Sequence, residues 1–211
     1  NLNFTHQFLS VIRKINPKAN FFFAGSSEMY SKNIKQKINE KTNFDPKSAY
    51  GIAKVASHYL VKNYRDNYNF KASTGILFNH ESPRKDEKFV LKKIAKSVAR
   101  IKFGLQKKIF LGNIKSKRDW GHAKDYVEGM WRILQADKPD DYVLSTNEFH
   151  SVREFVEKSF ALKGFTIRWK GEGINEIGYD EATGRELIFV SKKYFRPAEV
   201  EELLGDSTKA R

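Results

Sequence analysis

The stretch FFFAGSSEMY, residues Phe21 to Tyr30, places a glycine, two serines and a glutamate directly after four apolar residues. A continuous apolar run of this length is typical of a strand that is buried inside a parallel sheet. Ligands of open α/β sheets bind beyond the carboxyl ends of such strands. We therefore expect Ser26 and Glu28 to face a bound molecule. The structural alternative is that Ser26 and Ser27 cap a turn and that Glu28 is solvated.

Helical and strand patterns alternate along the rest of the chain. Helices are expected where apolar residues recur at helical spacing or where a capping signal begins a segment, over residues 2–15, 48–68, 89–103, 122–135 and 151–164. Ser48 is a plausible N-cap of the second of these helices. Strands are expected in short apolar runs, over residues 21–24, 72–78, 109–112, 142–146 and 165–169. This alternation indicates an α/β fold with a mostly parallel, doubly wound sheet. Pro197 is well placed in the first turn of a last short helix.

The composition is that of a globular protein, with 40% hydrophobic and 14% aromatic residues. No apolar run approaches the roughly 20 residues that cross a bilayer, and no secretory signal is visible, so we expect a soluble, cytoplasmic protein. The absence of cysteine excludes disulfides and a thiolate nucleophile. The 39 basic residues outnumber the 25 acidic ones and give a net charge of +14. This excess attracts phosphates, or it is only a solvated, lysine-rich surface.

Tyr50 and Lys54 lie four residues apart on an expected helix, so their side chains project from one face. A neighbouring ammonium favours the phenolate, and we therefore expect the pKa of Tyr50 to be lowered from its reference value of about 10. The phenol could then take a proton from a hydroxyl group. The Tyr-x-x-x-Lys spacing alone is found in many helices by chance. Its position after the strand that leads to Ser26 and Glu28 makes it a candidate site.

Six segments of the chain are more specific than this spacing: AGSSEMY, YGIAK, GILFNHESPR, KRDWGHAKDYVEGMW, HSVREFVEKSF and YFRPAEVEELLGD. Together they closely resemble the GDP-mannose 4,6-dehydratases, which are extended short-chain dehydrogenase/reductases that use NADP. The resemblance extends over residues 4–211. Sister families share the Tyr/Lys pair but not the combination of Asn-His-Glu-Ser-Pro-Arg with Lys-Arg-Asp-Trp-Gly-His-Ala-Lys-Asp-Tyr.

The resemblance implies a catalytic set formed by Ser26, Glu28, Tyr50 and Lys54. Tyr50 would take the proton of the C4 hydroxyl of GDP-bound mannose while hydride passes from C4 to NADP, and Lys54 would hold the nicotinamide ribose. Glu28 would remove the C5 hydrogen, which the C4 ketone acidifies, and assist loss of the C6 hydroxyl as water. Return of the hydride to C6 would give GDP-4-dehydro-6-deoxy-mannose with no net change in the cofactor.

Ser26 and Glu28 are the two positions that decide how far the chemistry of the family applies to this chain. Ser26 stands where the family usually has threonine, and its hydroxyl would bond the C4 oxygen. The epimerases of the superfamily generally lack the carboxylate at the position of Glu28, which favours elimination over epimerisation.

Further contacts are implied by the same resemblance. NADP would be contacted by Tyr50, Lys54, His80 and Lys85, the last at a position where the family commonly has arginine, which unlike lysine contacts a phosphate with two donors. GDP-mannose would be contacted by Asn79, Val90, Lys93, Arg118, Arg196 and Glu199. Residues 88–92, KFVLK, depart from the usual Asn-Phe-Val-Thr-Arg, so the contacts of the replaced side chains differ. No metal site is expected, because His58, His122 and His150 lack a metal-ligand spacing.

The resemblance also implies two domains and an oligomer. Residues 1–82 would form the C-terminal half of a Rossmann-type NADP-binding domain. Residues 83–211 would form mainly a smaller α/β substrate-binding lobe, interleaved with late elements of the sheet. The fold class is thus a partial Rossmann-like sheet with a smaller C-terminal lobe. Members of the family form homo-dimers or tetramers, and we expect neither nucleic acid nor membrane as a partner.

The Gly-rich turn G-x-G-x-x-G, which holds the pyrophosphate in dinucleotide-binding folds, is not found in the 211 residues. GEGINE, at residues 171–176, follows a strand pattern but lacks the third glycine and a following helix, so we interpret it as a decoy. The first β-α-β units, on the order of 100 residues, are therefore expected to be absent. We expect the 211-residue chain alone to bind NADP poorly and to be nearly inactive.

Three alternatives stay open at this point. Another nucleotide-sugar epimerase or dehydratase would share the Tyr/Lys pair. A basic nucleic-acid-binding protein would explain the net charge, although no recognised module is present. A non-catalytic remnant that binds a GDP-sugar would explain the missing glycines.

Overall fold

The structure is a computed structural model that describes residues 2–30, 36–194 and 203–211. Two compact units are formed from alternating parts of the sequence. The first unit comprises Asn1–His80, Arg118–Phe149 and Glu202–Arg211, and the second comprises Glu81–Lys117 and His150–Glu201. Both contain helices and strands, which confirms the α/β class. The assignment of residues 1–82 to the cofactor and of residues 83–211 to the substrate stays a prediction.

The first unit is built on a parallel sheet of three strands in the order β1-β2-β7. These strands are β1 (Phe21–Ala24), β2 (Ala72–Leu77) and β7 (Asp141–Leu144). Phe21 pairs with Ala72, and Leu77 pairs with Leu144. The parallel sheet that the alternating pattern predicts is thereby confirmed.

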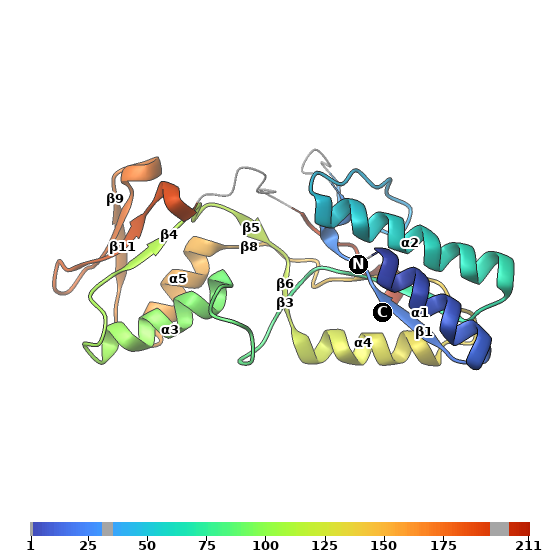
Figure 1. Ribbon diagram of the computed structural model, residues 1–211. Coiled ribbons are helices and arrows are strands. Elements are labelled where there is room, and N and C mark those ends of the chain that lie inside the picture. Colours follow the sequence, from blue (N-terminus) through green and yellow to red (C-terminus); the bar gives the residue numbers. More distant parts are fainter. Residues whose placement is uncertain (1, 31–35, 195–202) are drawn as a thin grey trace. The chain divides into compact units, whose positions relative to one another are not determined.

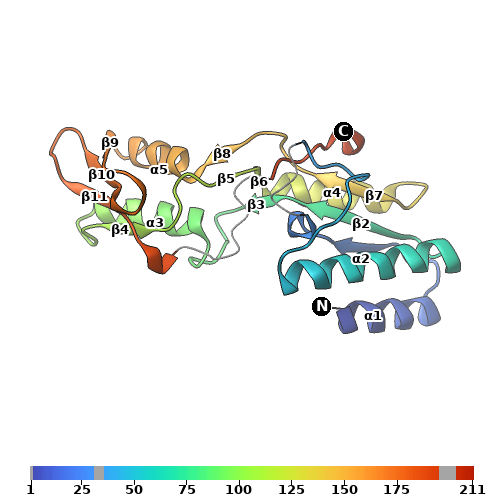
Figure 2. The ribbon, with the colours of Figure 1, turned by 90° about the horizontal axis from the view of Figure 1, so that it is seen from above.

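Helices cover both faces of this sheet. On one face lie α1 (Leu2–Ile15) and α2 (Ala49–Tyr68), and on the other lies α4 (Ala123–Gln135) (Figures 1 and 2). Side chains alternate along β1 accordingly. Phe23 packs with Leu9 and Val61 from α1 and α2, whereas Phe22 packs with Tyr126 of α4. The run of phenylalanines therefore fills two separate cores, as a strand inside a doubly covered sheet must.

Two short strands adjoin the sheet in the same unit. β3 (Asn79–Glu81) follows β2 in the sequence and pairs with β6 (Trp120–His122). Where the chain passes between the units it forms β5 (Lys117–Arg118) and β8 (His150–Ser151). Short 3₁₀ turns complete the chain at η1 (Ser27–Met29), η2 (Gly173–Asn175), η3 (Lys192–Tyr194) and η4 (Thr208–Ala210).

The second unit contains α3 (Val90–Lys102), α5 (Val152–Ala161) and a sheet of four strands. These strands are β4 (Ile109–Leu111), β9 (Ile167–Lys170), β10 (Ile177–Asp180) and β11 (Glu186–Val190), in the order β4-β11-β10-β9. Only β4 and β11 are parallel, so this sheet is mixed. The segment GEGINE connects β9 to β10 through η2. A strand follows it and not a helix, which agrees with the interpretation that it is not a dinucleotide-binding turn. The helix expected at Pro197 lies outside the described residues.

A buried carboxylate joins three segments of the first unit. Asp119 is fully buried, and its oxygens accept hydrogen bonds from the Thr146 backbone N–H (2.8 Å) and hydroxyl (2.7 Å), from the Asn147 N–H (3.0 Å) and from the Gly205 N–H (3.4 Å). A Cβ atom on Gly205 would lie 2.4 Å from Cβ of Ser145, so only glycine allows this approach. Asp119 therefore ties the residues before the C-terminus to the loop after β7.

No helix in the described part of the chain has both the length and the apolar character that crossing a membrane requires.

His58 of α2 is buried against the sheet of the first unit. Its Nδ1 lies 3.2 Å from Oγ1 of Thr74, and its Nε2 lies 3.9 Å from Oδ2 of Asp141, which also forms a two-point ion pair with Arg65. Burial is the main cause that lowers the pKa of His58 below its ordinary value. The cations Arg65 and Lys62 act in the same direction, and Asp141 opposes them.

A pH dependence of stability follows from this lowered pKa. As the pH falls through about 6.5, the unfolded chain binds a proton at residue 58 before the folded chain does. The contribution of His58 is therefore complete above that pH and is lost as the pH drops toward the folded pKa. We expect the melting temperature to fall more steeply between about pH 7 and pH 5 in the wild type than in His58→Gln. Equal slopes in both proteins would contradict this prediction.

Candidate active site

The carboxyl end of β1 passes into a tight turn that carries two of the predicted residues. Ser26 is the N-cap of η1, and its hydroxyl accepts a hydrogen bond from the Glu28 N–H at 3.2 Å. The capping role considered above is thus present, and the Glu28 side chain is exposed as that alternative requires. The cap does not remove Ser26 from the candidate site, because its side chain also hydrogen-bonds that of Tyr50.

Helix α2 begins directly against this turn and brings the other two residues. The backbone of Gly51 lies so close to the turn that an added Cβ would be 2.3 Å from the Glu28 carbonyl oxygen. Ser48 is the N-cap of α2, as predicted, and its Oγ accepts from the Gly51 N–H at 3.0 Å. The same hydroxyl donates to Oε2 of Glu28 at 3.2 Å. The structure therefore groups Ser26, Glu28 and Tyr50 at the end of β1, with Ser48 as an unexpected fourth member.

The electrostatics of Tyr50 differ from the expectation. Its pKa is raised, chiefly by burial and further by the charge of Glu28, while the hydrogen bond with Ser26 acts to lower it. Lys54 lies near, with Nζ 5.5 Å from the centre of the Tyr50 ring, but its ammonium donates to the Ala24 carbonyl oxygen at 2.7 Å. The predicted lowering of the Tyr50 pKa is wrong, because burial outweighs a lysine that faces the backbone. Burial also lowers the pKa of Lys54.

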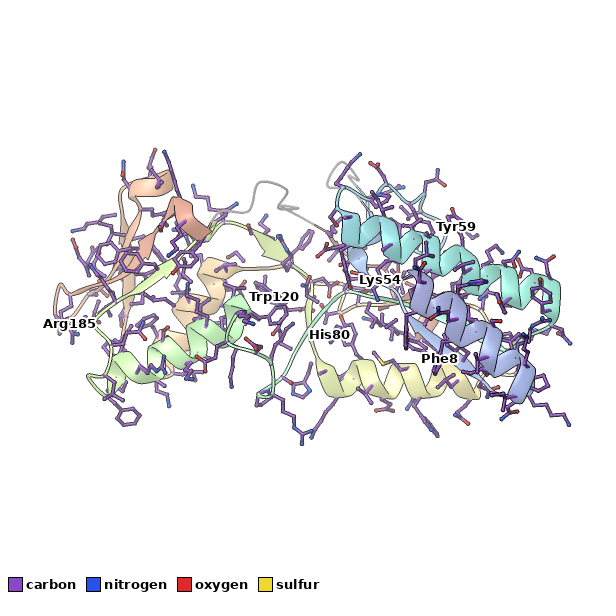
Figure 3. All side chains as sticks on the ribbon, viewed as in Figure 1. Phe8, Lys54, Tyr59, His80, Trp120 and Arg185 are labelled. Atoms are coloured by element: carbon purple, nitrogen blue, oxygen red, sulfur yellow. The ribbon has the colours of Figure 1, made fainter. Side chains whose placement is uncertain are left out.

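Three more predicted residues belong to the first unit. Asn79 and His80 lie in β3, beside β6, which carries Trp120, and Figure 3 marks Lys54, His80 and Trp120 on their elements. Nδ1 of His80 lies 2.9 Å from the Phe78 carbonyl oxygen, and the His80 ring lies 4.8 Å from that of Tyr126. Arg118, in β5, is half-buried. The structure does not test the contacts predicted for these residues.

The second unit holds Lys85, Val90 and Lys93. Lys85 pairs with Oε1 of Glu81 at 2.7 Å, and Val90 is the exposed first residue of α3. Lys93 donates to the Phe110 carbonyl oxygen at 2.6 Å, its Nζ lies 3.6 Å from the centre of the Tyr194 ring, and burial lowers its pKa.

Two predicted substrate contacts, Arg196 and Glu199, lie outside the described residues. Within the described ranges, no cluster of three or more histidine, aspartate or glutamate side chains could hold a metal ion.

The close approach of Gly51 yields a testable prediction. Gly51→Ala places a methyl group against the rigid Glu28 carbonyl oxygen and Cβ of Pro46, so either the helix or the turn must move. We expect a loss of about 1–3 kcal/mol in the free energy of unfolding, measured by urea denaturation.

Gly129→Ala in α4 is the matched control, because it adds the same helix propensity but meets only the flexible end of Leu144. If Gly51→Ala is no less stable than Gly129→Ala, the close packing of α2 on the turn is refuted.

Sequence reasoning missed the second hydrogen bond of Ser48 and the role of Asp119. The N-cap signal identified Ser48 only as the start of a helix. Asp119 stands inside a quoted motif, next to Arg118, but an aspartate in a charged stretch gives no sign that it is buried.

Comparison with known proteins gives one consistent result. The family model described as GDP-mannose 4,6 dehydratase matches residues 1–211. The GDP-mannose 4,6-dehydratase of Sinorhizobium fredii is 51% identical over 196 residues, which are 92% of this chain and 55% of that protein. The human GDP-mannose 4,6 dehydratase is 52% identical over 191 residues, 90% of this chain and 51% of that protein. The chain spans about half the length of the curated relatives it matches.

Solved structures share the fold at low identity. RMD from Pseudomonas aeruginosa, complexed with NADPH, matches with a TM-score of 0.81 at 18% identity and covers 99% of this chain and 64% of its own. The dTDP-glucose 4,6-dehydratase of Bacillus anthracis, in complex with NAD, matches with a TM-score of 0.76 at 18% identity, over 98% of this chain and 58% of its own. These matches confirm a Rossmann-like fold.

Proposed function

The chain belongs to the GDP-mannose 4,6-dehydratase family, and from this premise we propose that it acts in the conversion of GDP-D-mannose to GDP-4-dehydro-6-deoxy-D-mannose. The observation that carries the proposal is the group formed by Ser26, Glu28 and Tyr50 at the carboxyl end of β1. A hydroxyl, a carboxylate and a phenol in one place supply the acid and base groups that oxidation and elimination require.

The donors around Tyr50 and Lys54 fit one end of NADP. A desolvated ammonium and a phenol beside the end of β1 suit the hydroxyl groups of the nicotinamide ribose. The fit is limited to this end, since the Gly-rich turn that binds a pyrophosphate is not among the 211 residues. When bound, NADP accepts a hydride from the sugar and returns it. We propose His80 and Lys85 as further contacts of the cofactor.

Tyr50 is the proposed base for the C4 hydroxyl. Its raised pKa means that the phenolate is rarer at neutral pH but more basic once formed. Ser26, which hydrogen-bonds Tyr50, is placed to form a hydrogen bond with the same C4 oxygen. The two side chains would together hold the proton that leaves the C4 hydroxyl group during oxidation.

Glu28 is the proposed base for the elimination. Its exposed carboxylate stands on the turn beside Tyr50, and its negative charge is one cause of the raised Tyr50 pKa. A carboxylate within electrostatic range of the phenol can act on the carbon next to the one that is oxidised. This placement supports a dehydratase over an epimerase.

The remaining predicted contacts are proposed as the substrate site. Arginine forks suit a diphosphate, and the set comprises Asn79, Val90, Lys93, Arg118, Arg196 and Glu199.

We further propose that the protein is a cytoplasmic homo-oligomer. Large apolar side chains on α1 are exposed, among them Phe4, Phe8, Val11 and Ile15, and the Phe4 and Phe8 rings stack at 5.5 Å. An exposed apolar patch of this kind is typical of a protein interface. Sedimentation velocity would test this proposal, since Phe4→Glu is expected to shift the protein toward the monomer.

Incubation of the protein expressed from its full gene with GDP-mannose and NADP in deuterated water tests the function. A 4-dehydro-6-deoxy product with deuterium at C5 is the expected result, because elimination removes the C5 proton and a solvent deuteron is added at C5 when the hydride returns to C6. An epimerised sugar with its C6 hydroxyl intact would indicate an epimerase instead. Saturable binding of GDP-mannose without turnover would indicate a non-catalytic remnant, and salt-dependent binding of DNA would favour the nucleic-acid alternative.

A further inference from the structure

We propose that Ser48 is a positioning residue for Glu28, so that the hydroxyl that begins helix α2 also sets the catalytic carboxylate. The inference rests on the proposed function. Ser48 is half-buried, its Oγ accepts from the Gly51 N–H at 3.0 Å, and it lies 3.2 Å from Oε2 of Glu28.

The direction of these hydrogen bonds follows from the chemistry of a hydroxyl. A serine side chain has one proton to donate and two lone pairs to accept. The Gly51 N–H uses a lone pair, and the ionised carboxylate of Glu28 can only accept, so the single proton points to Glu28. Over the described residues, Ser48 is the only side chain that donates to this carboxylate.

Backbone contacts hold Ser48 and Glu28 close to each other. The Asp45 N–H donates to the Met29 carbonyl oxygen at 3.0 Å, which ties the loop before Ser48 to the turn that carries Glu28. Gly51 packs closely against the Glu28 carbonyl oxygen. These contacts fix the backbones of Ser48 and Glu28 close together, so the Ser48 hydroxyl is within reach of the Glu28 carboxylate.

The consequence for the reaction concerns the elimination alone. With Oε2 held by Ser48, Oε1 of Glu28 is left to take the proton from C5. The electron pair of the C5–H bond then forms the C5=C6 double bond, the C6–O bond breaks, and the proton taken by Glu28 leaves with the C6 hydroxyl as water. A misdirected carboxylate would slow this step, whereas oxidation at C4, which uses Tyr50, would continue.

Four variants of Ser48 separate positioning from helix capping. Aspartate and asparagine are both good N-caps and have the same size, but at about pH 8 only asparagine has a proton to donate. Threonine keeps the hydroxyl, and alanine loses both the cap and the donor. We expect Ser48→Asp to melt near the wild-type temperature, yet to lose about ten- to a hundredfold in kcat.

The test uses the protein expressed from its full gene, with GDP-mannose, and follows the absorbance of reduced cofactor. We expect reduced cofactor to accumulate in Ser48→Asp and Ser48→Ala, because oxidation outruns elimination, and not in Ser48→Thr or the wild type. Ser48→Asn is expected to keep more activity than Ser48→Asp.

The proposal is overturned if Ser48→Asp turns over like Ser48→Asn without accumulation of reduced cofactor, or if Ser48→Ala loses activity only in proportion to its loss of folded protein. Failure of the proposed function is distinct, because the wild type itself would then not convert GDP-mannose.

Discussion

Glu28→Gln is expected to lower kcat for GDP-mannose by about a hundred- to ten-thousandfold, the usual effect of losing a general base. Glutamine has the same size, and its amide oxygen still accepts the hydrogen bond that Ser48 donates at 3.2 Å in the wild type. It cannot, however, take the C5 proton. Steady-state kinetics of the protein expressed from its full gene, together with the exchange of the C5 hydrogen with deuterated solvent, measure the effect.

The same variant carries a second expectation for Tyr50. Because the charge of Glu28 raises the Tyr50 pKa, its removal should lower that pKa, and NMR of ring-labelled tyrosine can follow the titration. Glu128→Gln is a suitable control, since Glu128 lies on α4 and pairs with Arg132 at 2.5 Å. Retention of kcat and of C5 exchange in Glu28→Gln would show that another group is the base.

Asp119→Ala is expected to have the largest effect on stability, a loss of about 3–5 kcal/mol in the free energy of unfolding. The variant leaves the N–H groups of Thr146, Asn147 and Gly205 without their acceptor, at about 1–3 kcal/mol for each buried group that stays unsatisfied. Urea denaturation, followed through a spectroscopic signal from the first unit, measures this loss in the free energy of unfolding.

Asp140→Ala is the matched control for this variant. Asp140 lies on the same unit and pairs with Lys209 at 2.5 Å, but the pair is exposed and therefore contributes little. Equal midpoints and slopes for the two variants would show that Asp119 is not the tie that its hydrogen bonds indicate.

The sequence is sufficient to predict those helices and strands whose local patterns agree with their packing in the fold. The helix that begins at Ser48 and the strand at Phe21–Ala24 are found where the pattern predicts them. The strands β10 and β11 were missed, because their pairing depends on partners far along the chain and on a mixed sheet that no local pattern announces.

The candidate site shows the same limit at the level of side chains. Helical spacing correctly predicts that Lys54 lies near Tyr50, but it does not predict which acceptor the ammonium hydrogen-bonds. In the structure it is the Ala24 carbonyl oxygen, so the expected effect on Tyr50 does not arise. The contact of Ser48 with Glu28 depends on how a loop of about twenty residues returns to the strand, which no motif encodes.

The tie at Asp119 has a consequence for synthesis of the protein. The strand β1 and the residues around Gly205 belong to the same compact unit, yet almost the whole of the chain separates them. During translation, therefore, the parallel sheet can assemble once β7 has left the ribosome, but Asp119 gains its last hydrogen bond only when Gly205 emerges. Until then the buried carboxylate of Asp119 lacks one of its hydrogen-bond donors. The first unit of the nascent chain is incomplete during this interval and is open to binding by a chaperone.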